Sequence, residues 1–481
     1  MIQLRTDTPE FFSDLSDVIR LFYGDVAVSP DAGETVICHA ARREGENWVD
    51  TWTGSGEEYV LTRPAAGRDE LEIKRFRKRA VKLGLYGLLK RVTGIRPPWG
   101  ALTGIRPTRL LYEAMEDGLD REAAVRFLAE EFDVSPEKAG LLGEISEMQQ
   151  GLRELPAGMF DLYIGIPFCT TRCAYCSFSS GEIGRGTLVE PYVQALLSEI
   201  DQAAALMREK GLRLRAGYIG GGTPTSIACG QLEAILAAAQ RAFPGAVEWT
   251  VEAGRPDTID ADKLRMLRDH AVTRISVNPQ TFSDETLRRI GRAHTGADTL
   301  RAYELARSLG FDDINMDLIA ALPGENFADF ERTLGIVREL APESVTVHSL
   351  AIKRSSRLHE RLHVEEGQHS QVSAPEAERM ITYARETLTA GGWKPYYLYR
   401  QKYMAGNLEN VGYARPGKAC LYNIGNMEET ASVLALGAGA ITKWLFPRQL
   451  RIERAPNVKN IEQYIARVDE MVARKRALIF S

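Results

Sequence analysis

The stretch CTTRCAYC carries the residues of this sequence whose types and spacing most directly suggest chemistry. Cys169, Cys173 and Cys176 stand four and three residues apart, a spacing compatible with an iron–sulfur site, a redox pair, a zinc knuckle or three packed thiols. A structural zinc site normally uses four protein ligands in two pairs, and no second pair accompanies this loop. Three thiolates in one loop suit three irons of a [4Fe–4S] cube, whose fourth iron is then open to a substrate or cofactor.

Other cysteines and histidines do not complete this site. Cys229 and Cys420 are solitary in the sequence. His359 and His363 have a ligand-like spacing, but they lie on a polar segment far along the chain, and we interpret them as a surface pair.

Polar and glycine residues recur after consecutive strand-like runs. The cysteine loop follows the first run, and GGGT (220–223) follows the second. Later runs end in or contain further polar residues, namely Glu252, Gln280, Asp317, His348 and Ser349. Functional residues of α/β sheets gather at the carboxyl ends of parallel strands, so we expect these side chains to face one cavity.

The elements that must position these residues alternate between strands and amphipathic helices. The strand-like runs are 161–167, 216–222, 247–253, 274–280, 313–323 and 344–352, and the helical stretches between them include 189–210, 231–243, 261–270, 297–309 and 327–340. Such alternation predicts an α/β fold with a parallel sheet covered by helices. Six units fit a partial (β/α)6 barrel, and periodicity alone leaves an open doubly wound sheet as the alternative.

Residues 1–155 differ in texture and predict an N-terminal α+β accessory region. Strand-like pieces at 34–44, 48–54 and 58–63 precede helical sequence from about Glu70. The distinctive stretch RPPWGALTGIRPTRLLYEAME contains turn-forming prolines and glycines, and Thr108 is a candidate cap for the helix that follows. Arg96 and Arg106 in the paired GIRP segments are candidates for anion binding, with solvated or salt-bridged arginines as the plainer interpretation.

Composition bounds the class of protein. The chain has 481 residues, 44% of them hydrophobic and 26% charged, which is typical of a globular protein of about three domains. The net charge of −5 gives no reason to expect a nucleic-acid partner. No run approaches the length of a membrane span, and the N-terminus MIQLRTDTPEFFSDL does not read as a signal peptide, so we expect a cytoplasmic protein.

CxxxCxxC after a first strand, with GGGTPT after the second, resembles the radical S-adenosylmethionine (SAM) superfamily over about residues 160–390. The resemblance implies that Cys169, Cys173 and Cys176 ligate a [4Fe–4S] cluster. It also implies that the open iron takes the amino and carboxylate groups of SAM, whose reductive cleavage yields a 5′-deoxyadenosyl radical. Glycines 220–222 let backbone approach the amino-acid end of the cofactor.

The stretches YIGIPFCTTRCAYCSF, ISVNPQTFSDETLRRIGRAHT and INMDLIAALPGE resemble the oxygen-independent coproporphyrinogen III oxidase family. That resemblance implies SAM contacts before, within and after the cysteine loop and along the later strands. The implied residues are Tyr163, Tyr175, Gly221, Gly222, Thr223, Glu252, Gln280, Arg292 and Asp317.

The segment PYYLYRQKYMAGNLENVGYARPGKACLYNIGN, with EAGRPDTI and WGALTGIRPT, is similar to the HemZ-like branch of this family. Two departures stand out. Phe178 occupies the position where oxidases of the family carry a further cysteine, and CSF resembles the loop of the family's heme chaperones. Tyr422 stands where those chaperones carry a heme-binding histidine, and nearby Cys420 is interpreted as a buried structural thiol rather than a heme ligand.

The resemblance implies a radical SAM oxidoreductase that decarboxylates two propionates of coproporphyrinogen III to vinyl groups, giving protoporphyrinogen IX. The expected partners are a tetrapyrrole substrate and a reduced electron donor of the flavodoxin or ferredoxin type. A heme-binding chaperone and a radical SAM enzyme acting on heme or another tetrapyrrole stay open as alternatives.

The expected organisation is an accessory region at 1–155, a radical SAM core at 156–390 and a substrate or cap region at 391–481. In the last region Arg400, Lys402 and Arg415 are candidates to anchor substrate carboxylates, with ordinary surface cations as the equal alternative.

Overall fold

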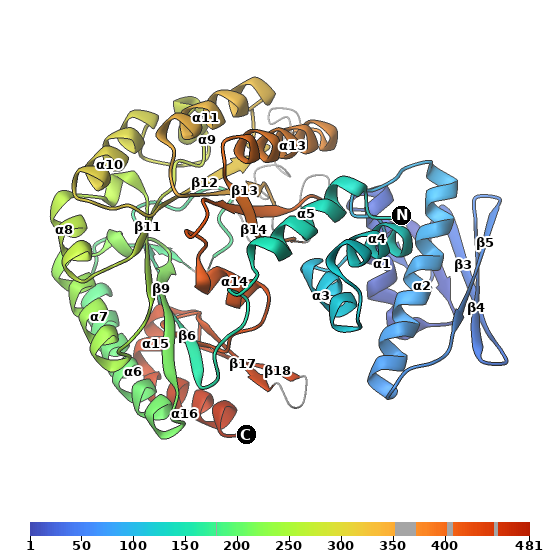
Figure 1. Cartoon of the computed structure of the whole chain (residues 1–481), viewed down its shortest axis with the longest axis horizontal. Coiled ribbons are helices and arrows are strands. Elements are labelled where there is room, and N and C mark those ends of the chain that lie inside the picture. Colours follow the sequence, from blue (N-terminus) through green and yellow to red (C-terminus); the bar gives the residue numbers. More distant parts are fainter. Residues whose placement is uncertain (179, 352–371, 402–406, 447–450) are drawn as a thin grey trace. The chain divides into compact units, whose positions relative to one another are not determined.

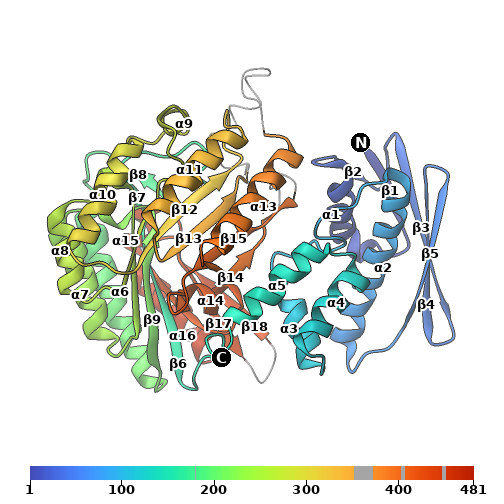
Figure 2. The ribbon, with the colours of Figure 1, turned by 45° about the horizontal axis from the view of Figure 1, so that its top comes forward.

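The predicted alternation of strands and helices is confirmed in the computed structural model, which describes residues 1–481 except 179, 352–371, 402–406 and 447–450. The six parallel strands are β6 (Met159–Ile166), β9 (Arg213–Gly221), β10 (Glu248–Gly254), β11 (Arg274–Val277), β12 (Ile314–Ala320) and β13 (Ser344–Ser349). Between them run α6 (Val189–Glu209), α7 (Cys229–Ala242), α8 (Ala261–Asp269), α9 (Asp284–Arg289), α10 (Gly296–Ser308) and α11 (Phe327–Leu340). Figures 1 and 2 show α6, α7, α8, α10 and α11 following one another along the outer side of the sheet.

The barrel is partial and not closed. In the described residues the strands form one 11-stranded sheet in the order β14-β15-β13-β12-β11-β10-β9-β6-β16-β17-β18. The C-terminal sequence supplies both ends of that order, as β14 (Lys394–Tyr399) and β15 (Asn410–Ala414) beyond β13 and β16 (Val433–Leu436), β17 (Ile441–Phe446) and β18 (Arg451–Pro456) beyond β6. β16 pairs in parallel with β6, whereas β15 pairs antiparallel with β13. The chain after β13 therefore extends the sheet that carries the parallel strands.

The remaining helices of this part of the chain are α13 (Ala374–Ala390), α14 (Leu421–Met427), α15 (Ile461–Ala466) and α16 (Val468–Ile479), and short elements are β7 (Phe168–Cys169), β8 (Gly181–Glu182), η2 (Pro224–Ser226) and η3 (Pro256–Thr258). α15 and α16 pack beside α6. Figure 1 shows α14 on the opposite, concave side of the sheet from α6, α7 and α8.

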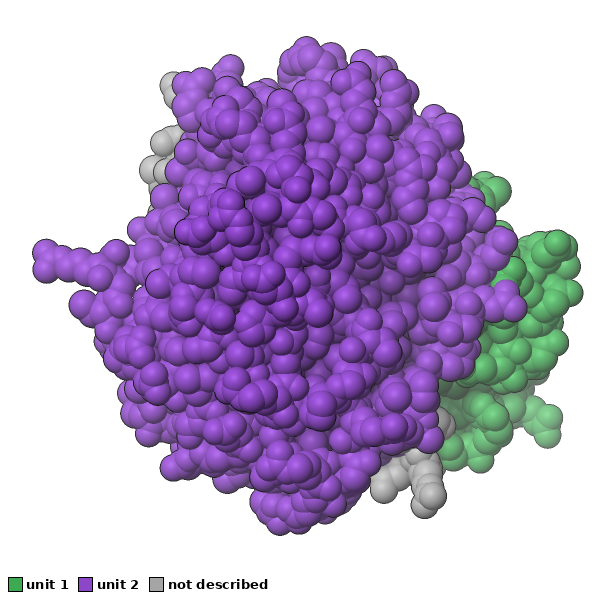
Figure 3. All heavy atoms as spheres, turned by 60° about the vertical axis from the view of Figure 1, so that its left-hand side comes forward, with its two compact units in different colours: residues 1–143, 400–403 green, residues 144–399, 404–481 purple. Residues whose placement is uncertain are grey.

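The chain divides into two compact units, coloured separately in Figure 3. Unit 1 comprises Met1–Gly143 with Arg400–Tyr403, and unit 2 comprises the rest. The sequence analysis predicts three regions with separate functions, divided at residues 155 and 390. Their separate functions stay a prediction.

Unit 1 has its own five-stranded sheet in the order β2-β1-β3-β4-β5. Its elements are β1 (Ile2–Thr6), η1 (Pro9–Phe11), α1 (Phe12–Tyr23), β2 (Val28–Ser29), β3 (Thr35–Glu44), β4 (Asn47–Gly54), β5 (Glu57–Pro64), α2 (Glu70–Thr93), α3 (Thr108–Glu116) and α4 (Arg121–Phe132), followed by α5 (Pro136–Met148). Trp52 of β4 is fully buried, and a Cβ on Gly84 of α2 would lie 2.5 Å from its Nε1. The glycine lets the helix approach the sheet closely.

Local signals explain most helix ends, with one correction. Asp69 accepts a hydrogen bond from the Glu72 amide and starts α2, and Gly94 ends it with a φ of 69°. Thr108 was predicted to cap the next helix, but it is the first residue of α3, and Pro107 occupies the cap position without a side-chain hydrogen bond. Pro107 already has the helical φ of −66° and ψ of −26°, so the backbone enters the helix before Thr108, which therefore lies inside the helix and not at its cap.

Candidate functional site

The cysteine loop leaves the sheet directly after β6. Cys169 lies on β7, which pairs with β8, so that the loop between them closes on itself. The Ile183 amide donates to the Cys169 carbonyl at 2.8 Å, and the Gly181 amide donates to the Pro167 carbonyl at 2.9 Å. Inside the loop the Cys176 amide donates to the Cys173 carbonyl at 3.1 Å. The backbone therefore presents all three thiols from one short closed segment.

The three thiols are neighbours in space. Each is partly exposed, and burial, with the proximity of Cys173 and Cys169, raises the pKa of the Cys176 thiol. Within the described part of the chain, no three His, Cys, Asp or Glu side chains converge tightly enough to hold a single metal ion. In a [4Fe–4S] cube each thiolate binds a different iron, so its ligands stand apart from one another. The donor set fits a cluster of that kind with one iron left open.

The EAGRPDTI stretch, which begins in β10 and continues beyond it, supports one side of the cysteine loop. Arg255 donates from Nη1 to the Thr171 carbonyl at 2.8 Å, and Thr170 donates from its hydroxyl to Oδ2 of Asp257 at 2.9 Å. The Arg255 side chain is 4% exposed and pairs with Asp257 at 3.1 Å. Nδ1 of the buried His294 ring lies 3.6 Å from Oδ1 of Asp257. This ion pair therefore holds the first turn of the loop.

The segment after α9 supports the other side. The Ala174 amide donates to the Ile290 carbonyl at 2.9 Å, and the Thr171 hydroxyl donates to the Gly291 carbonyl at 3.0 Å. Arg292 donates from Nη2 to the Tyr175 hydroxyl at 3.3 Å and from Nη1 to the Asn278 carbonyl at 3.3 Å. Two predicted site residues, Tyr175 and Arg292, thus meet beside the thiols.

The glycine run after β9 lies against both the loop and the next strand. Gly221 has a φ of 115°, a conformation that residues with a Cβ rarely adopt. A Cβ on Gly222 would lie 2.5 Å from the Phe168 carbonyl oxygen and 2.9 Å from Sγ of Cys169. Its neighbour Thr223 places Oγ1 3.6 Å from the same sulfur. At Gly222 the space that a side chain would take is occupied by the cysteine loop, and at Gly221 it is occupied by the backbone of Ile166. The sequence alone did not indicate this reason for the two glycines.

Two predicted acids, Glu252 and Asp317, lie close together on neighbouring parts of the sheet. Tyr218 donates a 2.6 Å hydrogen bond to Oε1 of Glu252. Burial, reinforced by the negative charge of Asp317, raises the pKa of Glu252 to about 7. Burial also opposes ionisation of Asp317, but His348 at 3.9 Å and an Asn315 hydrogen bond of 2.8 Å outweigh it and hold the Asp317 pKa below its usual value. Glu252 therefore titrates near neutral pH, whereas Asp317 stays ionised.

Gln280 sits next to Asp317 in an unusual backbone conformation. Its φ is 65°, and it forms an isolated bridge to Leu318. The Gln280 amide donates to the Asp317 carbonyl at 2.9 Å, and the Ile319 amide donates to the Gln280 carbonyl at 3.0 Å. A non-glycine residue in this region stores strain of the kind that clusters at functional sites.

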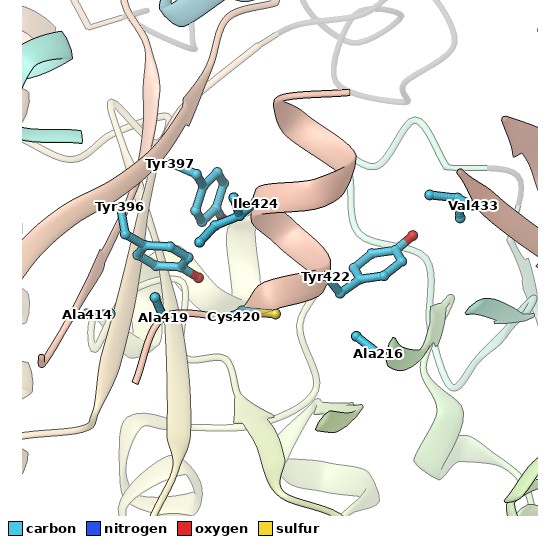
Figure 4. Packing of buried hydrophobic residues seen from close by; sticks show 9 residues of the cluster. All are labelled: Ala216, Tyr396, Tyr397, Ala414, Ala419, Cys420, Tyr422, Ile424 and Val433. Carbon is cyan, nitrogen blue, oxygen red and sulfur yellow. The ribbon is translucent and has the colours of Figure 1, made fainter. Parts of the chain in front are cut away.

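Three tyrosines stack on the concave side of the sheet. The ring centroids of Tyr218 and Tyr422 are 4.6 Å apart, and Tyr163 lies 6.3 Å from each. Figure 4 shows Tyr422 projecting from α14 near Ala216, with Tyr396 and Tyr397 on the other side of the helix. Tyr163 was predicted, whereas the contribution of Tyr218 was missed. Its spacing of two residues from Gly220 along β9 was the signal that it shares that residue's face.

Cys420 is a buried structural thiol, as predicted. It is 1% exposed and donates to Oε1 of Glu248 at 3.3 Å, and burial raises its pKa. Glu248 also accepts the amides of Leu421 and Tyr422 and pairs with Arg274 at 2.9 Å. The start of α14 is therefore fixed to β10 and β11.

The proposed carboxylate anchors are engaged in packing. Arg415 lies 3.6 Å over the Trp393 ring and donates to the Gly391 carbonyl. Arg400 is 6% exposed, lies 5.3 Å over Trp99 and donates to the Leu102 carbonyl at 2.6 Å within unit 1. Lys402 and the pair His359 and His363 lie outside the described residues.

Comparison with known proteins agrees with this geometry. The family model of the radical SAM superfamily matches residues 163–337. The protein of Bacillus subtilis named oxygen-independent coproporphyrinogen-III oxidase-like protein HemZ is 38% identical over 407 residues, which cover 83% of this chain and 80% of that protein. The chain belongs to this HemZ-like family of radical SAM proteins.

Two further proteins are similar to this chain. The heme chaperone HemW of Escherichia coli is 31% identical over 294 residues, 60% of this chain and 70% of HemW. The solved structure of the coproporphyrinogen III oxidase HemN from Escherichia coli has a TM-score of 0.54 at 24% identity, covering 70% of this chain and 73% of HemN, which shows the shared fold.

Membership of the radical SAM superfamily implies a [4Fe–4S] cluster and SAM for the HemZ-like chain. An oxidase-like protein and a heme chaperone are thus both among the relatives of the chain. Among the described residues, none of the helices is long and apolar enough to span a membrane.

Proposed function

We propose that this protein is a radical SAM enzyme that oxidatively decarboxylates coproporphyrinogen III to protoporphyrinogen IX. The observation that carries the proposal is the set of groups at consecutive strand ends. Three thiols follow β6, a glycine turn packed on Cys169 follows β9, and the carboxyl of Glu252 lies in β10. This set occurs in a chain 38% identical to a coproporphyrinogen oxidase-like protein.

The cluster would be held by Cys169, Cys173 and Cys176. Their loop is held on one side by the pair of Arg255 and Asp257 and on the other by the segment after α9. SAM would contact Tyr163, Tyr175, Gly221, Gly222, Thr223, Glu252, Gln280, Arg292 and Asp317. When bound, the cluster and SAM supply a one-electron reductant and an acceptor for a hydrogen atom. For each vinyl group formed, a propionate loses one hydrogen atom, carbon dioxide and one further electron, and a reduced electron donor of the flavodoxin or ferredoxin type starts each cycle.

The chain's own residues would then position the reactants. Ionised Glu252 accepts hydrogen bonds, and its contact with Tyr218 keeps its carboxyl on the concave face. Arg292 orients the Tyr175 ring beside the thiols. The rings of Tyr163 and Tyr218, which are only partly buried, offer an aromatic surface suited to an apolar macrocycle, and buried Tyr422 supports them from behind.

Heme trafficking is the second candidate, favoured by the likeness to HemW and by Phe178, which is 71% exposed where oxidases carry a cysteine. Tyr422 and Cys420 oppose it. Tyr422 is packed in the tyrosine stack, and Cys420 is a buried thiol bonded to Glu248, so neither is presented to an iron. Radical chemistry on heme or another tetrapyrrole is the third candidate and differs in its product.

One anaerobic experiment tests the proposal. The reconstituted protein is given reductant, SAM and coproporphyrinogen III, and products are identified by mass. The proposal expects protoporphyrinogen IX with 5′-deoxyadenosine. Cofactor cleavage with unchanged porphyrinogen would overturn the substrate assignment. A parallel heme titration that gave a defined Soret band at one equivalent, without any vinyl product, would favour the chaperone.

A further inference from the structure

Unit 1 contains a cavity of about 340 Å³ that the proposed function does not use. Its described lining is strongly basic, with Glu113 as the one acidic residue among the groups that line it. The cations are Arg75, Lys78, Arg79, Lys82, Arg106 and Arg109. Apolar side chains complete the walls, among them Leu83, Leu102 and Phe132.

Two sequence elements build this cavity. Arg75, Arg79 and Lys82 stand at intervals of four and three residues on α2, which places them on one face of the helix. The opposite wall is the WGALTGIRPT stretch and the first turn of α3, whose amino-terminal end carries a partial positive charge. Lys82 joins the walls by donating from Nζ to the Thr103 hydroxyl at 2.6 Å. A motif to which the proposed radical chemistry assigns no role therefore lines the cavity.

The positive charge exceeds what the lining can neutralise. Glu113 is shared by Arg109 at 3.0 Å, Arg75 at 3.2 Å and Arg79 at 3.8 Å. Two carboxylates outside the lining take part as well, because Arg75 also lies 3.4 Å from Glu72 and Lys78 lies 3.4 Å from Asp14. Arg79 otherwise lies 5.2 Å over the Phe132 ring, and Lys82 bonds to a neutral hydroxyl. Burial lowers the pKa of Lys82 to about 8, although the negative charge of Asp14 opposes the shift, and the positive charge of Lys78 adds to it. Cations gathered in a partly enclosed space attract an anion that can reach it.

We propose that this cavity binds a small ligand that carries two or more oxyanion groups on an apolar body. Guanidinium groups pair with phosphate and carboxylate in two-point contacts, and the apolar walls suit a non-polar ligand part. The volume lies at the lower end of ligand pockets, which fits a ligand of about nucleotide size. Phosphate esters and polycarboxylates share this chemistry. The proposal is independent of the decarboxylase assignment because it concerns unit 1 alone.

Isothermal titration of the full-length protein tests this proposal with two probes, adenosine diphosphate and citrate. Saturating SAM is present throughout, so that the nucleotide is kept from the barrel. We expect saturable binding of at least one probe, and the probe that binds identifies the phosphate or the carboxylate source. Lys82→Gln and Arg109→Gln, on opposite walls, should each weaken binding by at least about tenfold, since each removes a charge-assisted contact.

Lys74→Gln is the matched control, because Lys74 is an exposed residue of the same helix that does not line the cavity. It should bind the probe as the wild type does. Thermal melting checks that each variant is folded. Because the Arg109 side chain is exposed, Arg109→Gln removes its charge without disturbing buried packing. Absence of saturable binding for both probes, or equal weakening by Lys74→Gln, would overturn the proposal.

Discussion

The Tyr218 hydroxyl donates a 2.6 Å hydrogen bond to Glu252, so that the aromatic stack of β6, β9 and α14 and the carboxyl of β10 form one connected group. Burial sets the ionisation of this group, with the pKa of Glu252 raised to about 7. The carboxyl is therefore neutral below pH 7 and ionised above it. Only the ionised form can accept hydrogen bonds with both oxygens, which is the form that the proposed contact of Glu252 with SAM would use.

We predict that SAM affinity rises with pH in the wild-type protein through this group. If the ionised form alone binds well, its contribution tightens binding by about tenfold between pH 6 and pH 8. Glu252→Gln removes the titrating group and should lose this part of the pH profile. Equilibrium binding of SAM to both proteins measures the difference, and parallel profiles would show that Glu252 does not control the cofactor.

Asp257 is predicted to be a positioning residue for the cysteine loop. Asp257→Ala removes the partner of Arg255 and the acceptor of the Thr170 hydroxyl, so the loop loses its support next to Cys169. We expect iron content and the cluster's visible absorption after reconstitution to fall by about half or more, with the fold retained, because hydrogen bonds to charged groups contribute about 1.5–3 kcal/mol each.

Asp262→Ala serves as the control for that variant. Asp262 lies on α8 with a side chain 85% exposed and pairs only at the surface with Arg265. Its cluster content should match the wild type. A normal cluster in Asp257→Ala would remove the positioning role.

Gly222→Ala is predicted to abolish cluster binding. The new Cβ would fall 2.5 Å from the Phe168 carbonyl oxygen and 2.9 Å from the Cys169 sulfur. Relieving this clash requires the backbone of the cysteine loop to shift. Gly230→Ala on α7 is the counterpart, since nothing lies within 4 Å of the position that its new methyl group would take. That change should leave the cluster intact and stabilise the helix by up to about 1 kcal/mol. Electron paramagnetic resonance of the reduced cluster compares the two, and an unaltered signal in Gly222→Ala would refute the packing argument.

Arg274 is predicted to matter for stability rather than chemistry. Its side chain is 5% exposed and joins Glu248 to Asp313, both at 2.9 Å. Arg274→Met leaves two buried carboxylates without their cation and should lower the free energy of unfolding by about 3–5 kcal/mol. Urea denaturation measures this loss. Arg265→Met, at an exposed position of α8, should change stability by less than about 1 kcal/mol, and equal losses would contradict the account.

The parallel strands were predictable because each apolar run is short, ends at a turn and precedes an amphipathic helix. The runs at 216–222 and 313–323 correspond to β9 and β12 for that reason. The pairing of Val433 with Asp161, which adds β16 beside β6, was not predictable, since register between distant segments depends on tertiary packing. The predicted helix cap at Thr108 failed because proline already fixes the start of α3.

Within the site, residue types at strand ends were readable from the sequence, whereas the contacts between them were not. Tyr175 and Arg292 were both named, yet their hydrogen bond depends on how the loop after α9 folds back. The stack of Tyr163, Tyr218 and Tyr422 joins three separate segments, and no local pattern specifies such an arrangement.

The central claim is tested most directly with coproporphyrinogen III deuterated at the β-carbons of its propionates. The reconstituted protein is reduced anaerobically with SAM, and the mass of 5′-deoxyadenosine is measured alongside the porphyrinogen products. We predict deuterium in the 5′-deoxyadenosine and two such molecules for each protoporphyrinogen IX formed, with neither product in Cys173→Ala. Unlabelled 5′-deoxyadenosine, or labelled substrate returned unchanged, would contradict it.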